Sequence, residues 1–114
     1  SWVRHPDLPD HPNHAVAQRQ LPKGTTSMIV FGVKGGFDAG RKLINSVKLA
    51  SHVSNVGDAK TLLVHPASTT HMQLGPEQRK LAGVPDDLIR LSVGIEHVDD
   101  IIDDLRASLR ASQR

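Results

Sequence analysis

Apolar residues recur along the chain in short runs and helical stripes that predict a small α/β protein. Runs of strand length, rich in β-branched residues, occupy residues 27–33, 61–64 and 88–93. Helical spacing and end signals predict helices over residues 13–20, 39–50, 76–81 and 97–111. This alternation indicates an α/β or α+β sandwich, in which helices cover a sheet of about three to four strands. It leaves the strand directions open.

The two longer predicted helices each have an apolar face. In the first, the face consists of Leu43, Ile44, Val47 and Ala50. In the last, it consists of Val98, Ile101, Ile102, Leu105 and Leu109. Opposite that stripe lie four carboxylates, Asp99, Asp100, Asp103 and Asp104. We expect them to form a solvated helix face rather than acid–base pairs.

The first residues differ from the rest in composition. Pro6, Pro9 and Pro12 stand among polar residues and restrict the backbone to extended or turning conformations. We therefore divide the chain into a lead-in with a short helix, residues 1–26, and a sheet-containing domain, residues 27–114. The sequence does not begin with Met, and we expect it to be part of a longer chain.

Composition limits the function classes. The 114 residues suit one domain, with 38% hydrophobic residues, mixed charges of net +2 and only 3% aromatic residues. A nucleic-acid surface needs a basic stripe, often with aromatic partners, and we expect none. We also expect no membrane segment, because no apolar run reaches about eighteen residues. Cysteine is absent, which excludes disulfide and thiolate chemistry and favours a reducing cytoplasm.

Two segments contain residue types found in metal or phosphate sites but lack the spacing that such sites require. Metal-ligating side chains crowd the lead-in at His5, Asp7, Asp10, His11 and His14. The prolines among them make convergent geometry hard to assemble, so we favour a polar lead-in without metal. Gly35-Gly36 before a predicted helix is typical of a turn, because neither a phosphate loop nor a dinucleotide fingerprint is completed there.

Arg90 lies inside a predicted apolar strand, where an unpaired charge is costly. It pairs either with a carboxylate of the protein or with one from a ligand, because two parallel N–H groups of a guanidinium match two oxygens. The pattern leaves both open.

Residues 65–71, His-Pro-Ala-Ser-Thr-Thr-His, follow another strand end, where ligand sites are common. Taken alone, these residues favour a capped turn.

A resemblance to a known family lies in residues 54–71 and 89–96. The first segment resembles the signature of the pyridoxal-phosphate enzymes of cysteine and methionine metabolism, and the second is similar to their carboxy-terminal signature. Residues 8–14, with Arg19-Gln20, and the Gly35-Gly36 turn are similar too, so the resemblance covers nearly the whole chain. It implies the carboxy-terminal domain of an enzyme whose fold is like that of aspartate aminotransferase.

Within that family, residues 55–60 and 65–71 are most similar to O-acetylhomoserine sulfhydrylases. The related γ-synthases and lyases usually have serine where this chain has Asn55. The branch implies γ-replacement, in which sulfide or a thiol replaces acetate on O-acetyl-L-homoserine to give homocysteine or methionine. A cystathionine γ-synthase, a methionine γ-lyase and a non-catalytic binding or assembly module are the alternatives.

The resemblance also implies the site. Arg90 falls on the arginine that binds the substrate α-carboxylate, Asn55 on a position that helps to hold it, and Thr70 on a threonine of the substrate pocket. No catalytic, cofactor-binding or metal-binding residue is expected in this chain. The family's Schiff-base lysine lies upstream in a Ser/Thr-x-Thr-Lys stretch, and that context is missing around Lys23, Lys34, Lys42, Lys48 and Lys60. We therefore expect pyridoxal 5′-phosphate in a preceding domain, no activity from this chain alone, and a homotetramer when full length.

Overall fold

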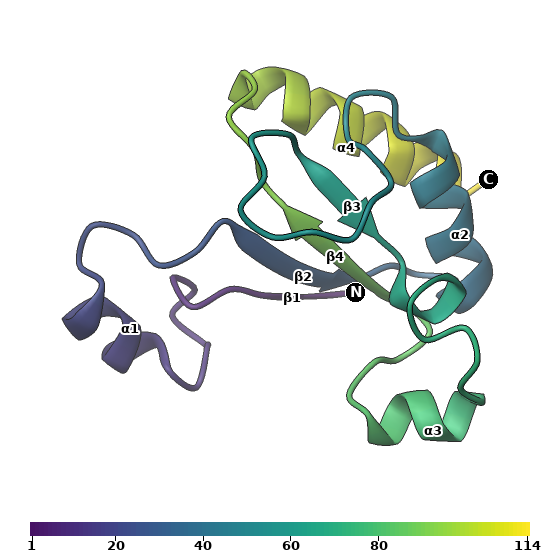
Figure 1. Ribbon diagram of the computed structural model, residues 1–114, viewed down its shortest axis with the longest axis horizontal. Helices are drawn as coiled ribbons and strands as arrows, with labels where there is room; N and C mark the ends of the chain where they lie inside the picture. The colour runs from purple at the N-terminus through teal and green to yellow at the C-terminus, as the bar shows by residue number, and fades with distance from the viewer.

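The computed structural model describes residues 1–114 and contains one four-stranded sheet (Figure 1). Its strands are β1 (Trp2–Arg4), β2 (Met28–Gly32), β3 (Leu62–Val64) and β4 (Leu88–Ser92). Their order is β1-β2-β4-β3, and each neighbouring pair is antiparallel. The structure thereby settles the strand directions. The predicted class, a small sheet covered by helices, is confirmed.

Two of the helices cover one face of this sheet. The helices are α1 (His14–Gln20), α2 (Gly36–Ser46), α3 (Pro76–Leu81) and α4 (Val98–Ser112), with a short 3₁₀ helix, η1 (Pro66–Ser68). Helices α2 and α4 lie side by side as the covering layer, whereas α1 and α3 extend from opposite ends of the molecule (Figure 1). No helix combines the length and the apolar character that crossing a membrane requires.

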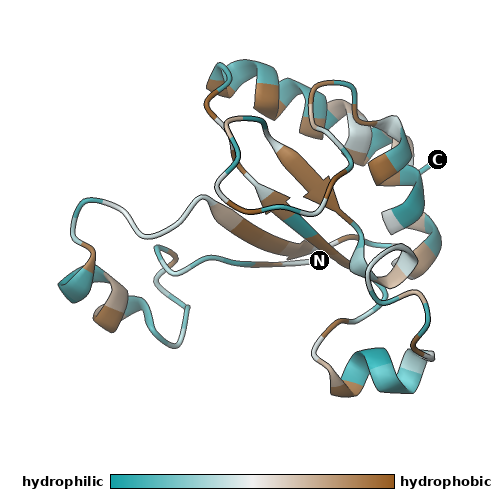
Figure 2. Cartoon of the chain, viewed as in Figure 1, coloured by the Kyte–Doolittle hydropathy of each residue, from teal (hydrophilic) through white to brown (hydrophobic).

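The core lies between the sheet and α2. Leu43 of α2, Leu63 of β3 and Ile89 of β4 are fully buried there, and β2 and β3 are hydrophobic along most of their length (Figure 2). Alternation along β4 places Ile89 and Leu91 in this core and turns Leu88 and Arg90 to the opposite face. The strand predicted over residues 88–93 is confirmed, and Arg90 lies on the face that the helices leave uncovered.

Strand β1 was not predicted, because three residues are too few to show a period. Tertiary contacts hold it at the sheet edge. The indole Nε1 of Trp2 donates to Oδ2 of Asp87 at 2.9 Å, and the amino group of Ser1 donates to the carbonyl of Gly32 at 3.1 Å. The lead-in thus contributes a strand to the sheet as well as α1.

Helix α2 begins and ends earlier than predicted, since Val47 is extended at φ −65° and ψ 143°. Asp104 of α4 explains the segment that follows. Its carboxylate accepts backbone N–H bonds from Lys48, Leu49 and Ala50 at 2.8, 2.9 and 3.1 Å. The expectation that Asp104 belongs to a solvated face is therefore wrong: it is partly buried and joins α4 to the chain after α2.

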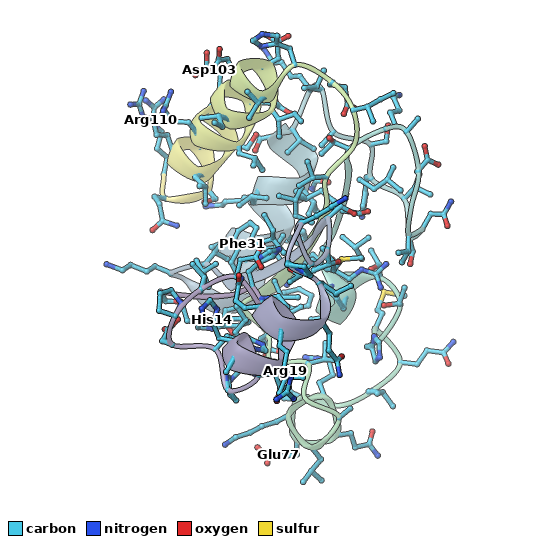
Figure 3. All side chains as sticks on the ribbon, turned by 90° about the vertical axis from the view of Figure 1, so that its left-hand side faces the viewer. His14, Arg19, Phe31, Glu77, Asp103 and Arg110 are labelled. Atoms are coloured by element: carbon cyan, nitrogen blue, oxygen red, sulfur yellow. The ribbon has the colours of Figure 1, made fainter.

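The predicted apolar stripe of α4 is only partly correct. Ile101 is buried and Leu105 packs against the core, but Val98, Ile102 and Leu109 are 61%, 43% and 39% exposed. The helix meets α2 through a narrower face, so the outer part of the stripe faces solvent. Asp103 and Arg110 point away from the sheet (Figure 3).

Candidate functional site

Arg90 projects from the middle of β4, on the face opposite the helix layer. Its backbone partners are Val30 of β2 and Val64 of β3, so its guanidinium stem lies between two apolar neighbours. Nη2 donates to the hydroxyl Oγ of Ser54 at 2.9 Å. No carboxylate of the chain lies within ion-pair distance of Arg90, and its partner is therefore a neutral hydroxyl. Its remaining N–H groups can bind the two oxygens of a carboxylate.

Asn55 is brought next to Arg90 by the loop that carries Ser54. Residues 52–60 are exposed and pass over β3 and β4 (Figure 1). Within this loop, Oδ1 of Asn55 accepts the N–H of Val56 at 2.8 Å, and its Nδ2 donates to Asp58 at 3.4 Å. The Asn55 amide thus shapes its own turn, one residue from the Arg90 contact.

Thr70 lies on the connection that leaves β3, beyond η1. Its hydroxyl lies 2.9 Å from Nδ1 of His71, and its side chain is exposed. No hydrogen bond joins it to Arg90 or to Asn55. The structure therefore brings Arg90 and the Asn55 loop together directly. It places Thr70 six positions after Val64, the β3 partner of Arg90.

His65 holds the start of the Thr70 connection in place. Its imidazole is fully buried, with Nε2 at 2.8 Å from the Asp86 carbonyl and Nδ1 at 2.9 Å from Oγ of Ser68. A carbonyl can only accept, so Nε2 carries the proton and Nδ1 accepts from the Ser68 hydroxyl. Burial lowers the pKa of His65, more than the nearby Asp86 raises it. The imidazole is therefore neutral and acts as a structural element of the turn.

Arg79 of α3 completes this support. Its Nε and Nη2 both reach Oδ1 of Asp86, at 2.9 and 2.8 Å, and its guanidinium lies 5.8 Å from the ring centre of Phe37. The Phe37 ring in turn meets His65 edge-on at 5.3 Å. Hydrogen bonds and an aromatic contact therefore fix His65, and with it the start of residues 65–71.

The lead-in histidines are used for turns. Nε2 of His5 lies 3.0 Å from the Thr26 carbonyl, and Nδ1 of His14 lies 2.9 Å from the Pro6 carbonyl. Across the chain, no three His, Asp or Glu side chains are close enough to hold a metal ion. Gly35 and Gly36, at φ 98° and 60°, form the turn from β2 into α2.

The largest hollow of the chain lies on the same sheet face, beside the Arg90 site. It has a volume of about 1160 Å³, and Trp2, Arg4, Met28, Val30 and Lys80 are among the residues that line it. Arg4 and Arg90 both pair with Val30, from opposite sides. Arg90, Asn55 and Thr70 do not line this hollow, so its size does not identify the carboxylate site.

No residue of the chain fits the attachment of an aldehyde cofactor. A Schiff-base lysine needs a shielded site, in which its amine can lose the proton at neutral pH. The lysines of this chain, Lys80 included, are all exposed: Lys23, Lys34, Lys42, Lys48, Lys60 and Lys80. The chain therefore supplies no covalent cofactor site.

Ser54 is the site residue that sequence reasoning missed. It stands one position before Asn55, in a stretch of small polar residues that has no periodicity. Only the passage of residues 52–60 over β4 brings its hydroxyl to Arg90. The signal available in the sequence was its adjacency to a position already implicated.

Comparison with known proteins places this geometry in a family. Residues 1–110 match the family of Cys/Met metabolism PLP-dependent enzymes. The chain is 48% identical to O-acetyl-L-homoserine sulfhydrylase 1 of Thermus thermophilus, over 96% of this chain and 26% of that protein. It is 50% identical to a homocysteine synthase of Schizosaccharomyces pombe, over 98% of this chain and 26% of that protein.

Other branches of the family are similar as well. An L-methionine gamma-lyase of Fusobacterium nucleatum is 49% identical over 94% of this chain and 27% of its own length. A crystal structure of cystathionine gamma synthase from Xanthomonas oryzae, in complex with cystathionine, superimposes with a TM-score of 0.86 at 39% identity. It covers 99% of this chain and 29% of its own. The chain spans about a quarter of the length of these curated relatives, and it belongs to the Cys/Met metabolism PLP-dependent enzymes.

Proposed function

We propose that this chain is the carboxy-terminal, substrate-recognising part of an O-acetylhomoserine sulfhydrylase, with residues 27–114 as its substrate-carboxylate-binding domain and β1 of the lead-in as an added edge strand. The observation that carries the proposal is the guanidinium of Arg90, which meets no carboxylate of its own chain and keeps donors free on the open sheet face. A bidentate carboxylate ligand suits those donors. The α-carboxylate of an amino-acid substrate provides that group.

The remaining roles follow from position. Arg90 binds the substrate carboxylate, while Asn55 helps to hold it by side chain or by backbone. Thr70 lines the pocket from the connection after β3. In the overall reaction the γ-carbon–oxygen bond of O-acetylhomoserine breaks, acetate leaves, and the sulfur of sulfide or a thiol bonds to that carbon. The bound pyridoxal phosphate of the family supplies the electron sink, and a preceding domain of the same protein holds it.

The synthase branch rests on a single local feature. The identities of 48% to a sulfhydrylase and 49% to a methionine γ-lyase do not separate the branches. Asn55, where the related γ-synthases and lyases usually have serine, favours the sulfhydrylases. A cystathionine γ-synthase or methionine γ-lyase activity is the second candidate, supported by the cystathionine-bound structure that the chain resembles.

Turnover by the full-length protein tests the branch. We expect O-acetylhomoserine with sulfide to give homocysteine and acetate in equal amounts, with little turnover of cystathionine or methionine. Reaction with cystathionine or methionine alone would refute the sulfhydrylase assignment.

Gel filtration of the same protein tests the expected homotetramer, and cell fractionation tests its cytoplasmic location.

Arg90→Lys in the full-length protein tests the carboxylate role. A lysine ammonium is a point charge and cannot reproduce the two parallel donors of a guanidinium. We expect KM for the amino acid to rise by about 10-fold or more, since removing a charged hydrogen bond costs about 1.5–3 kcal/mol. Arg41→Lys, on the exposed face of α2, is the matched control. Unchanged kinetics in Arg90→Lys would show that Arg90 is structural.

A further inference from the structure

Glu96 lies four residues after the end of β4 and joins it to the loop that faces Arg90. Its Oε1 accepts the backbone N–H of Thr61 at 2.7 Å, and its Oε2 accepts the Thr61 hydroxyl at 2.7 Å. Oγ1 of Thr61 accepts the N–H of Gly94 in turn, at 2.9 Å. Both oxygens of one carboxylate thus bind a single residue, Thr61, which is itself fully buried.

This contact lies where residues 52–60 rejoin the sheet. Thr61 directly precedes β3, and its carbonyl accepts the N–H of Ser51, where the same loop begins. The Ile95 N–H also donates to the Ala59 carbonyl at 2.9 Å. A Cβ at Gly94 would overlap the Ala59 carbonyl oxygen, so the two segments approach as closely as backbones allow.

Between its two ends the loop has few other attachments. Residues 52–60 are exposed throughout, and their one side-chain bond to the sheet is that of Ser54 to Arg90. The Glu96 carboxylate therefore fixes the end of the loop that carries Ser54 and Asn55, where it returns to the sheet. Arg90 lies on β4 and Glu96 on the segment that directly follows it, so one continuous stretch of chain carries Arg90 and holds the end of the loop that faces it.

The charge state of Glu96 agrees with this geometry. The two hydrogen bonds from Thr61, backbone first and side chain second, lower its pKa against the opposing effect of desolvation. Lys60 lowers it further. The carboxylate is therefore ionised at neutral pH and can accept both bonds.

We propose that Glu96 is a positioning residue for substrate binding: through Thr61 it holds residues 52–60 at the distance from Arg90 that a carboxylate requires. This inference rests on the proposed function of Arg90. It assigns to Glu96 no contact with substrate. Loss of the Glu96 contact should let the loop move away from Arg90 while β4 stays in place.

Four substitutions in the full-length protein test this. Glu96→Ala removes both hydrogen bonds, Thr61→Val removes the hydroxyl bond and keeps the backbone N–H, and Thr61→Ser keeps both. For Glu96→Ala we expect KM for the amino acid to rise by about 5- to 30-fold, with a smaller rise for Thr61→Val and with kcat per folded enzyme within about two-fold for both. Thr61→Ser should keep the wild-type KM. Glu77→Ala, at an exposed glutamate of α3 (Figure 3), is the matched control.

Hydrogen–deuterium exchange gives a readout independent of activity. In Glu96→Ala, the amides of residues 55–61 should exchange faster, while those of α4 keep their wild-type rates. Should Glu96→Ala fail to fold, Glu96→Gln replaces it. A glutamine has one acceptor oxygen for two donors and should give a smaller change in the same direction.

The outcomes separate the two proposals. If Arg90→Lys raises KM and Glu96→Ala leaves both KM and loop exchange unchanged, the positioning role is overturned and the role of Arg90 stands. A fall in folded protein at constant KM would likewise make Glu96 merely structural. If Arg90→Lys leaves KM unchanged, the proposed function fails, and the positioning role fails with it.

Discussion

The guanidinium Nη2 of Arg90 donates to the hydroxyl of Ser54 at 2.9 Å, across 36 positions of sequence. This bond joins the central strand β4 to the exposed loop of residues 52–60. It holds the arginine side chain toward that loop with a neutral partner, so its charge remains available. Ser54 therefore connects Arg90, the residue expected to bind the substrate carboxylate, to Asn55, which follows Ser54 in the loop.

Replacing Ser54 with alanine should weaken substrate binding in the full-length protein. Removal of one hydrogen bond of about 0.5–1.5 kcal/mol predicts a KM increase of about 2- to 10-fold. Steady-state kinetics with varied O-acetylhomoserine measures it. Ser27→Ala, at another exposed serine, should leave KM unchanged. An unaltered KM in Ser54→Ala would mean that the hydroxyl does not orient Arg90.

The Asp104 carboxylate should matter far more for stability than its neighbour Asp103. Asp104→Ala removes the acceptor of three backbone N–H groups and should lower the free energy of unfolding by about 2–3 kcal/mol. Asp103, 73% exposed and paired with Arg106, should cost about 0.5 kcal/mol or less when replaced. Urea unfolding of both variants decides this. Equal losses would contradict the role assigned to Asp104.

Gly40 should not tolerate alanine, although it lies within α2. In an open helix, alanine is favoured over glycine by about 1 kcal/mol. Here a Cβ would lie 2.5 Å from Nε2 of His65, and overpacking of that kind costs about 1–3 kcal/mol. We expect a net loss in the thermal unfolding of Gly40→Ala. Asn45→Ala, at an exposed position of the same helix, should instead stabilise slightly; a stabilised Gly40→Ala would refute the close packing.

Stability should fall in acid in a manner that depends on His65. The unfolded imidazole has the ordinary pKa of 6.5, whereas burial lowers the folded value. Between the two values the unfolded chain binds more protons. The contribution of the neutral His65 imidazole to the free energy of unfolding is therefore complete above pH 6.5. It is lost as the pH falls from there through the lower pKa of the folded state.

Urea unfolding between pH 8 and pH 5 measures that dependence. His65→Gln should be less stable throughout, because it disturbs the buried contacts, but should lose less on acidification than the wild type. His52→Gln, at an exposed histidine, should retain the full pH dependence. An identical acid slope in His65→Gln would assign the effect to other groups.

Much of the architecture could be predicted from pattern, because each long element carries its own period. The apolar run over residues 88–93 predicted β4 and set Arg90 apart as a charge within it. Helix α3 was predicted with the bounds that the structure shows. Periodicity was less informative for α4, since the width of a buried face depends on the partner helix, and Val98 and Ile102 proved exposed.

The sequence by itself determined the fold class, the family and the position of Arg90, because these depend on local period and on contiguous motifs. Only the tertiary structure decided what Arg90 contacts. The Ser54 hydroxyl, the Thr61–Glu96 contact and the Asp104 bonds join residues 36, 35 and 54–56 positions apart. Such pairs leave no spacing signal, since chain folding and not sequence distance sets their approach. In the sequence, Arg90 is a charge whose partner is not identified. In the structure it forms one half of a site, and the loop of residues 52–60 forms the other half.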